Sequence, residues 1–327
     1  MKASVVVPTY RRPELLMRCM AALENQNTFR DLAGDILSYE IIVADNAGDI
    51  QTCRAVKKMA AGSRVELRYV WAASRCGPAH ARNLGWQAAR GEIIAFTDDD
   101  TIPEENWLAE GVATLERNKS LAAAAGKTIV PLPPDPTDYE LNESGLASAE
   151  FVTANCFCRR EALEALGGFD ERFTEAWRED SDFHFRLIER GMTIGRSEAA
   201  IVVHPVRPAS FGVSLRQQRK SMLDALLFKK HPQLFRQTIG FFAGRYYLMV
   251  AALLVAIATF AAGYLVASVG FLLIWMALTA WFCRQRLRKT SHAPQHVLEM
   301  IVTSFLIPPT AIFWRLFGAI KFRVLFF

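Results

Sequence analysis

The chain has 327 residues, a formal net charge of +5 and 51% hydrophobic residues. This length suits two domains, or one large domain with an appendage, and the modest charge favours anionic lipid over nucleic acid as a partner. The six cysteines show no paired metal-ligand spacing, so we expect free thiols in a reducing compartment rather than a zinc site. The apolar run in the opening sequence MKASVVVPTYRRP stops at Pro8, too early for a signal peptide, which predicts a cytosolic N-terminal domain.

Short apolar runs alternate with helical patterns through about the first hundred residues. We expect strands at Val5–Val7, Ile41–Ala44, Val65–Val70 and Ile93–Phe96, with helices around Pro13–Glu24, Gln51–Ala60 and Pro78–Arg90. Continuous apolar runs are typical of parallel strands that are covered on both faces. The alternation therefore predicts an α/β fold with a doubly wound, Rossmann-like sheet.

Polar clusters follow three of these strands, at the edge of the sheet where ligands bind. They are Pro8-Thr9-Tyr10, Asp45-Asn46 and Asp98-Asp99-Asp100. The third cluster places three carboxylates side by side, and such charges repel each other unless a cation shares them. A hard divalent cation prefers oxygen ligands of this kind together with substrate phosphate. A solvated acidic turn is the alternative.

The pattern continues to residue 212, which we take as the end of the catalytic domain. We expect strands at Leu121–Val130, Phe151–Cys158 and Ile201–Val203, a Pro-rich loop at Pro131–Pro136, and helices at Arg160–Leu166 and from Asp180. Residues 213–240 form a linker whose stretch Ser214–Lys230 is basic and amphipathic. Such a helix suits the lipid headgroup layer, and packing against the soluble domain is the alternative.

Residues 241–327 are predicted to form a membrane region. The run Tyr246–Cys283 spans 38 residues without a charged residue or histidine. It is too long for one span of about 20 residues, so it predicts a hairpin (residues 246–283) that turns near Gly263. Basic residues flank both ends, which places both ends in the cytoplasm. A basic loop at 284–296 and an interfacial or re-entrant segment at 297–327 follow, with a third tilted span as the alternative for the last segment.

Five segments in this order resemble family two glycosyltransferases. VVVPTYRRPELLMRCM is similar to the opening strand and nucleotide loop of that family, EIIVADNA to its second strand, and GPAHARNLGWQAARGEIIAFTDDD to the helix that leads into its metal motif. TANCFCRREALEALGGFDERF and WREDSDFHFRL resemble its acceptor-side and catalytic-base segments. The matching pieces cover most of residues 1–205, and they imply a GT-A fold with a mixed sheet. A membrane hairpin after such a domain also occurs in this family.

The resemblance implies a nucleotide-sugar site that uses Mg²⁺ or Mn²⁺. Asp98 and Asp100 would bind the metal together with the donor diphosphate, and His204 would be a further ligand. The implied donor-binding residues are Pro8, Thr9, Tyr10, Arg12, Asp45, Gly77, Arg82, Asn83, Asp98 and Asp99.

Several of these donor residues have structural alternatives. Asp45 could be a turn residue or helix cap before Ala47 rather than an acceptor for the donor base. Arg82 could form an ion pair with Asp98 or Asp45. Gly77 is expected to meet a backbone requirement rather than to supply a chemical group.

Asp180 is the implied general base, with Asn155, Trp177 and Glu179 on the acceptor side. Inverting transfer needs a carboxylate that takes a proton from the acceptor hydroxyl. In the first turn of a helix, the dipole would favour the ionised form of Asp180. The alternative is that Asp180 only caps that helix.

These observations predict an inverting, metal-dependent glycosyltransferase of the hexosyltransferase type in the inner (cytoplasmic) membrane, with its catalytic domain in the cytoplasm. It would transfer sugar from a nucleotide-diphosphate-sugar, first of all a UDP-sugar, to a lipid-linked or polysaccharide acceptor during cell-envelope biosynthesis. Its partners would be this donor, this acceptor and membrane lipids, and not nucleic acid. An inactive sugar-nucleotide-binding scaffold and a nucleotidyltransferase are the alternatives, although the first strand lacks the glycine-rich loop of the latter.

Overall fold

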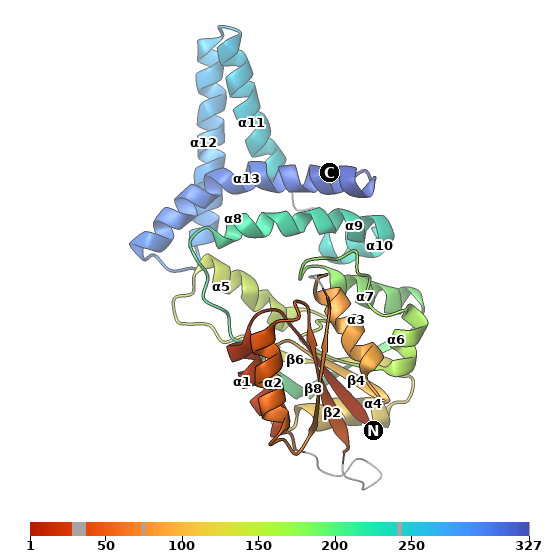
Figure 1. The fold of residues 1–327 in the computed structure, drawn as a ribbon. Helices are drawn as coiled ribbons and strands as arrows, with labels where there is room; N and C mark the ends of the chain where they lie inside the picture. Colours follow the sequence, from red (N-terminus) through yellow and green to blue (C-terminus); the bar gives the residue numbers. More distant parts are fainter. Residues whose placement is uncertain (28–36, 74–75, 241–243, 327) are drawn as a thin grey trace. The chain divides into compact units, whose positions relative to one another are not determined.

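The protein is described by a computed structural model in which residues 1–27, 37–73, 76–240 and 244–326 are placed. The chain forms two compact units (Figure 1). The first comprises Met1–Pro131 and Ser144–Val206, and the second comprises Leu132–Glu143 and Arg207–Phe327. The first unit thus ends at Val206, six residues before residue 212, where the sequence analysis places the end of the catalytic domain. The segment Leu132–Glu143 belongs to the second unit, although nothing in the local sequence indicates this.

The described part of the first unit forms an eight-stranded sheet. From edge to edge its strands are β3 (Glu66–Trp71), β2 (Tyr39–Asp45), β1 (Ala3–Thr9), β4 (Ile93–Thr97), β7 (Asn155–Arg159), β6 (Leu121–Ile129), β8 (Thr193–Val203) and β5 (Ile102–Pro103). Strands β3, β2, β1 and β4 are parallel, whereas β7 runs antiparallel to both β4 and β6. This is the mixed, doubly wound sheet that the sequence predicts.

Helices cover both faces of the sheet because its central strands are apolar on both sides. Val5 and Val7 of β1 pack in one core and Val6 packs in the other. The core of Val5 contains side chains of α1 (Pro13–Glu24), α2 (Ile50–Ala60) and α4 (Trp107–Arg117). The core of Val6 contains side chains of α3 (Pro78–Ala88), α6 (Arg160–Leu166) and α7 (Glu179–Glu189). The short 3₁₀ helix η1 (Ser144–Ser148) precedes β7.

The described part of the second unit is helical. Its elements are α5 (Asp138–Glu143), α8 (Val213–Gln217), the 3₁₀ turn η2 (Gln218–Ser221), α9 (Met222–Lys230), α10 (Pro232–Leu234), the π turn η3 (Phe235–Ile239), α11 (Gly244–Ala261), α12 (Leu265–Leu287) and α13 (Pro294–Phe322). Three of them, α11, α12 and α13, are long and apolar enough to cross a membrane.

Helices α11 and α12 form the hairpin that the sequence predicts. They are joined at Gly263, whose φ of +82° is readily adopted by glycine. One boundary differs from the prediction: α12 continues to Leu287 and α13 begins at Pro294, so the loop is shorter than residues 284–296. The basic residues after Cys283 extend the helix because they are good helix formers and suit its C-terminal end.

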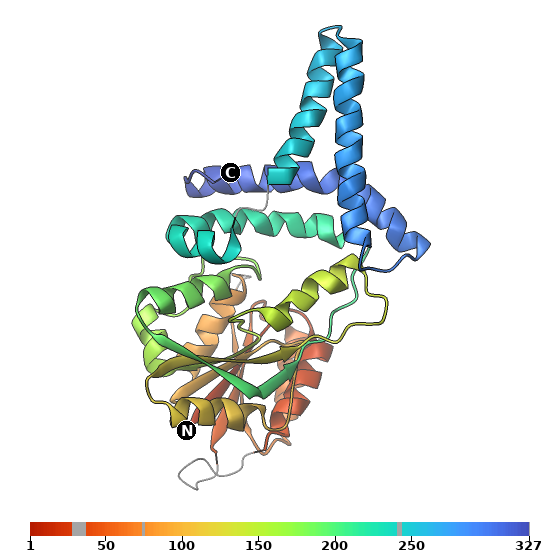
Figure 2. The same cartoon turned by 180° about the vertical axis from the view of Figure 1, so that it is seen from behind.

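Helix α13 is continuous, although Pro308 and Pro309 lie inside it. In both views it lies across the base of the α11–α12 hairpin rather than alongside it (Figures 1 and 2). It is long enough for the third span considered above.

The basic stretch Ser214–Lys230 packs against another helix of the same unit. A Cβ atom on Gly318 of α13 would collide with the carbonyl oxygen of Met222, so the two backbones are in close contact. Phe228 contacts Phe326, with ring centroids 5.4 Å apart. The apolar face of α9 is therefore covered by the C-terminal helix, a partner that local sequence does not reveal.

Candidate active site

The acidic triplet lies in a tight turn directly after β4. The hydroxyl of Thr101 donates to the carbonyl oxygen of Asp98 at 2.8 Å, and the hydroxyl oxygens of Thr97 and Thr101 are 2.7 Å apart. These bonds tie both sides of the turn together. They hold the three carboxylates at the carboxyl end of the parallel strands, where ligands bind in such sheets.

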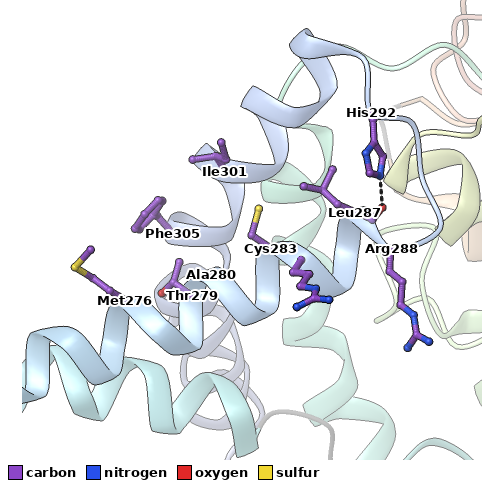
Figure 3. A pocket seen from close by; sticks show the side chains of 10 residues that line it. Met276, Thr279, Ala280, Cys283, Leu287, Arg288, His292, Ile301 and Phe305 are labelled. Carbon is purple, nitrogen blue, oxygen red and sulfur yellow. Dashed lines mark hydrogen bonds between the residues drawn. The ribbon is translucent and has the colours of Figure 1, made fainter.

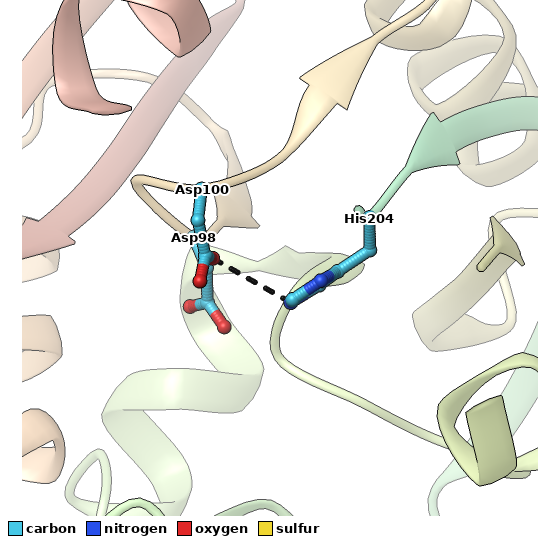
Figure 4. Close-up of side chains that lie close together, drawn as sticks. All are labelled: Asp98, Asp100 and His204. Atoms are coloured by element: carbon cyan, nitrogen blue, oxygen red, sulfur yellow. Dashed lines mark ion pairs between the residues drawn. The ribbon is translucent and has the colours of Figure 1, made fainter. Parts of the chain in front are cut away.

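Asp98, Asp100 and His204 come together at this turn (Figure 4). One possible ligand atom from each residue lies within 4.8 Å of the others. His204 directly follows β8, and its Nε2 lies 3.5 Å from Oδ1 of Asp100. Two carboxylates and an imidazole fit Mn²⁺, and the carboxylates also fit Mg²⁺. The three residues that the sequence assigns to a metal therefore converge in space.

Arg82 of α3 connects the acidic turn to the start of α7. Its Nη2 donates to Oδ1 of Asp98 at 2.8 Å, and its Nη1 donates to Oε1 of Glu179 at 3.0 Å. Burial disfavours the guanidinium charge, but the two carboxylates outweigh burial and raise the pKa of Arg82 above its usual value. Burial likewise acts to raise the pKa of Asp98, and Arg82 together with His204 lowers it below its usual value. Arg82 thus holds Asp98 ionised and in place.

Asp180 lies in the first turn of α7, as expected. Burial raises the pKa of Asp180 above its ordinary value, while the backbone N–H of Ser181 and the charge of Arg82 act in the opposite direction. Burial also raises the pKa of the neighbouring Glu179 to about 7, against the attraction of Arg82. At Asp180, desolvation therefore outweighs the Ser181 N–H and the Arg82 charge, which favour the ionised form. A carboxylate with a raised pKa is a better proton acceptor near neutral pH.

Asp99 bonds to the end of β1 and to the loop that follows it. Its Oδ2 accepts from the hydroxyl of Thr9 at 2.7 Å, and its Oδ1 accepts from Nη1 of Arg12 at 3.0 Å. Burial raises the pKa of Asp99 to about 6 even though Arg12 opposes this shift. Asp99 thereby orders the loop after β1. Pro8 lies inside β1, and the half-buried Tyr10 follows the strand with the Arg11 guanidinium over its ring.

Asp45 is fully engaged in the turn that follows β2. Its Oδ1 accepts from the N–H of Ala47 at 2.8 Å, and its Oδ2 accepts from the N–H of Asp49 at 2.8 Å and from the hydroxyl of Tyr69 at 2.6 Å. The side chain is completely buried. This is the turn-forming alternative stated above, and no local pattern pointed to Tyr69.

The loop before α3 depends on Asn46 and Gly77. The side-chain oxygen of Asn46 accepts from the N–H groups of Cys76 and Gly77, at 2.9 and 3.1 Å. Gly77 has a φ of +103°, and a Cβ atom there would lie 2.7 Å from the carbonyl oxygen of Thr174. Gly77 therefore meets a backbone requirement, as expected. Asn46, which the sequence analysis named in the Asp45-Asn46 cluster without giving it a role, thus holds this loop.

Two predicted site residues are instead bonded inside the protein. Asn83 donates to the carbonyl oxygen of Phe169 and accepts from the N–H of the same residue, so it holds the loop after α6. Asn155 is fully buried; it accepts from Nε1 of Trp107 and donates to the carbonyl oxygens of Lys127 and Ala200. Asn155 thus joins strands of the sheet and has no surface for an acceptor.

Trp177 and Glu179 lie on either side of Arg178, directly before and at the start of α7. The guanidinium carbon of Arg178 lies 4.5 Å from the centroid of the Trp177 indole ring. Arg178 has a φ of +74°, which is uncommon for a residue with a side chain. Trp177 is half-buried, and Glu179 is bonded to Arg82.

Comparison with known proteins agrees with this geometry. The family model for glycosyl transferase family 2 matches residues 4–167, and the model for glycosyl transferase family group 2 matches residues 93–316. Glycosyltransferase AglE of Haloferax volcanii is 26% identical over 225 residues, which are 66% of this chain and 70% of that protein. The chondroitin synthase of Escherichia coli is 24% identical over 280 residues, and the match covers 72% of this chain but 39% of that longer protein.

A solved structure supports the same fold. The mannosyltransferase PcManGT from Pyrobaculum calidifontis, solved in complex with GDP-Man and Mn²⁺, superposes with a TM-score of 0.60 at 23% identity. The superposition covers 93% of this chain and 87% of that one. From its mixed sheet and the two family matches, the chain belongs to glycosyl transferase family 2 and has a GT-A fold.

Proposed function

We propose that this protein is a membrane-anchored, metal-dependent inverting glycosyltransferase of the hexosyltransferase type. Its donor would be a nucleotide-diphosphate-sugar, first of all a UDP-sugar. Its acceptor would be a hydroxyl group of a lipid-linked or polysaccharide substrate at the cytoplasmic membrane face. One observation carries the proposal: Arg82 joins the Asp98–Asp100–His204 cluster to the start of α7, where Asp180 lies. Family membership and the donor and metal bound by the mannosyltransferase support it.

The metal cluster suits the donor side of this reaction. Asp98, Asp100 and His204 would hold Mg²⁺ or Mn²⁺, and the bound ion would neutralise charge on the leaving diphosphate. Arg82 fixes the orientation of Asp98 through a bond of 2.8 Å. Such fixed positioning matters because a pre-organised site does not have to reorganise during the reaction.

Asp180 suits the acceptor side. Its carboxylate would take the proton of the acceptor hydroxyl while that oxygen bonds to the anomeric carbon and the bond from this carbon to the donor diphosphate breaks. A single displacement of this kind inverts the anomeric configuration. The raised pKa of Asp180 increases its basicity, and Arg82 keeps the neighbouring Glu179 bonded and out of the reaction.

The helical unit supports a membrane location. Helices α11, α12 and α13 could each span a bilayer by length and composition. A catalytic domain on the same chain would meet a membrane-bound acceptor at high effective concentration. This argument favours an acceptor that is itself attached to the membrane.

A donor screen tests the proposed function. The full chain, purified in detergent, is incubated with UDP-, GDP- and dTDP-sugars, with Mn²⁺ or with a chelator, and release of the nucleoside diphosphate is measured. We expect release from one nucleotide class, only when the metal is present. Absence of both binding and hydrolysis across the panel would refute catalysis, while binding without hydrolysis or transfer to membrane extracts would indicate the scaffold alternative.

A further inference from the structure

A groove within the second unit lies between α12 and α13 and has a volume of about 560 Å³ (Figure 3). Its apolar part is lined by Met276 and Ala280 of α12 and by Ile301 and Phe305 of α13. Three of these large side chains are strongly exposed: Met276 at 52%, Ile301 at 44% and Phe305 at 41%. The catalytic proposal leaves this groove without a role.

The other end of the groove is basic. Arg284, Arg288 and His292 line it, and both arginines are exposed. Within the part of the chain that the structure describes, neither arginine forms an ion pair with a carboxylate. Arg286 differs, because it is turned inward and donates to Oδ2 of Asp138 at 2.7 Å. The two outward guanidinium groups are thus available to an anion.

The sequence spacing arranges these groups along one line. Met276, Ala280 and Arg284 of α12 and Arg288, which directly follows this helix, are four residues apart, so they form a single ridge that is apolar at one end and cationic at the other. At 1.5 Å per residue this ridge is about 18 Å long. One leaflet of a bilayer has a hydrocarbon layer of about 15 Å. The ridge therefore matches one lipid molecule in both length and polarity.

We propose that this groove binds an anionic phospholipid of the surrounding membrane. One acyl chain would lie between α12 and α13 against Ala280 and Phe305, and the phosphate would lie between Arg284 and Arg288. Charge complementarity favours this occupant over a zwitterionic lipid. The same complementarity favours an anionic phospholipid over an apolar protein helix, because such a helix would leave the guanidinium groups unpaired. The inference rests on the proposed membrane location, and it does not depend on the transfer chemistry.

Lipid binding to the delipidated full chain tests the inference. Phosphatidylglycerol and phosphatidylcholine with identical acyl chains are titrated in detergent and followed by native mass spectrometry. We expect clear preference for phosphatidylglycerol. R284Q/R288Q should weaken its binding roughly 30-fold, as expected for the loss of two basic groups near an anionic headgroup. A280F should weaken the binding of both lipids, because the exposed Ala280 lines the apolar part of the groove.

The control variant K289Q/K321Q removes the same charge from exposed lysines that do not line the groove. It should bind phosphatidylglycerol as the unchanged protein does. Equal losses in the control and in R284Q/R288Q would overturn the inference in favour of general surface charge. It would also be overturned by equal binding of the two lipids, by stronger binding of a polyprenyl phosphate than of phosphatidylglycerol, or by a dimer that A280F disrupts. Transfer is not measured in this assay, so its failure is separate from a failure of the catalytic proposal.

Discussion

Arg82 places its positive charge between the carboxylate of Asp98, in the acidic turn, and the carboxylate of Glu179, at the start of α7. It bonds to Asp98, one of the three residues of the proposed metal cluster, and to Glu179, which directly precedes the proposed base Asp180. The same ion pairs explain why Asp98 and Asp180 have opposite pKa shifts. Asp98 is bonded directly to the guanidinium, whereas desolvation dominates at Asp180.

Replacing Asp180 by Asn tests the assignment of the base. We expect transfer to fall about a hundredfold or more, the usual size of a general-base contribution, with donor affinity nearly unchanged. Donor binding is measured by calorimetry and transfer by diphosphate release from the same preparation. Asp182→Asn is the control, because Asp182 is paired with Arg186 at 2.8 Å and faces the interior. If D180N retains transfer within a few-fold, Asp180 is a structural residue.

Replacing Asp100 by Asn tests the metal cluster. One anionic ligand is lost, so we expect Mn²⁺ affinity to fall by at least tenfold and metal-dependent turnover to be abolished, with the fold retained. Manganese binding is followed by electron paramagnetic resonance and folding by circular dichroism. Glu92→Gln removes an exposed charge elsewhere and should change neither measurement. Normal Mn²⁺ binding by D100N would remove this residue from the site.

At the scale of elements, the start of α3 is placed by a close backbone contact. Gly77→Ala should destabilise the catalytic domain by about 3 kcal/mol, because the left-handed φ is strained and the new Cβ would collide with Thr174. Gly62→Ala is the matched control, since a Cβ at Gly62 meets no atom within 4 Å. Urea unfolding followed by tryptophan fluorescence compares the two variants. Equal midpoints would show that the loop adapts at little cost.

A second element-scale contact joins β1, β2 and the end of α3 through the buried Glu40. Burial acts to raise the pKa of Glu40, but bonds from Ser4, Arg90 and Arg68 together lower it below its ordinary value. A lowered folded pKa stabilises the protein above the unfolded pKa of about 4.3, and this stabilisation is lost as the pH falls through the folded pKa.

Glu40→Gln should therefore cost about 2 kcal/mol at pH 7, since it removes charge-assisted bonds in the core. The difference in free energy of unfolding between the two proteins should shrink below about pH 4. Urea unfolding across a pH series measures this difference. If the difference in free energy of unfolding stayed the same across the pH series, Glu40 would act through its shape rather than its charge.

At the scale of the whole molecule, the sequence predicts that both ends of the α11–α12 hairpin face the cytoplasm. In a cysteine-free background, Arg245→Cys and Arg288→Cys should react with a membrane-impermeant thiol reagent only from the cytoplasmic side. Tyr264→Cys, next to the hairpin turn, should react only from the opposite side. Labelling of positions 245 and 288 from opposite sides would contradict the positive-inside argument.

Much of the fold could be predicted from local pattern. The apolar runs predicted β1, β2 and β4 with ends at Val7, Ala44 and Phe96, one or two residues before the observed ends, and α1 and α6 were predicted with their observed bounds. Elements with weak periodicity were missed, among them α4, the two-residue β5 and the first part of β8. Their positions depend on pairing with distant strands, which short-range patterns do not encode.

The sequence by itself determined the alternation of strands and helices in the first hundred residues, the apolar helical hairpin and the residue types that meet at the carboxyl end of the sheet, because these depend on hydrophobic period and on strand direction. Only the tertiary structure decided which polar groups are already bonded: Asp45 to its own turn and Tyr69, Asn155 to α4 and two strands of the sheet, and Arg82 to both Asp98 and Glu179. It also assigned Leu132–Glu143 to the helical unit. The reason is physical. A polar side chain at a strand end can serve a ligand or the fold, and the choice depends on donors and acceptors that folding brings from distant parts of the chain.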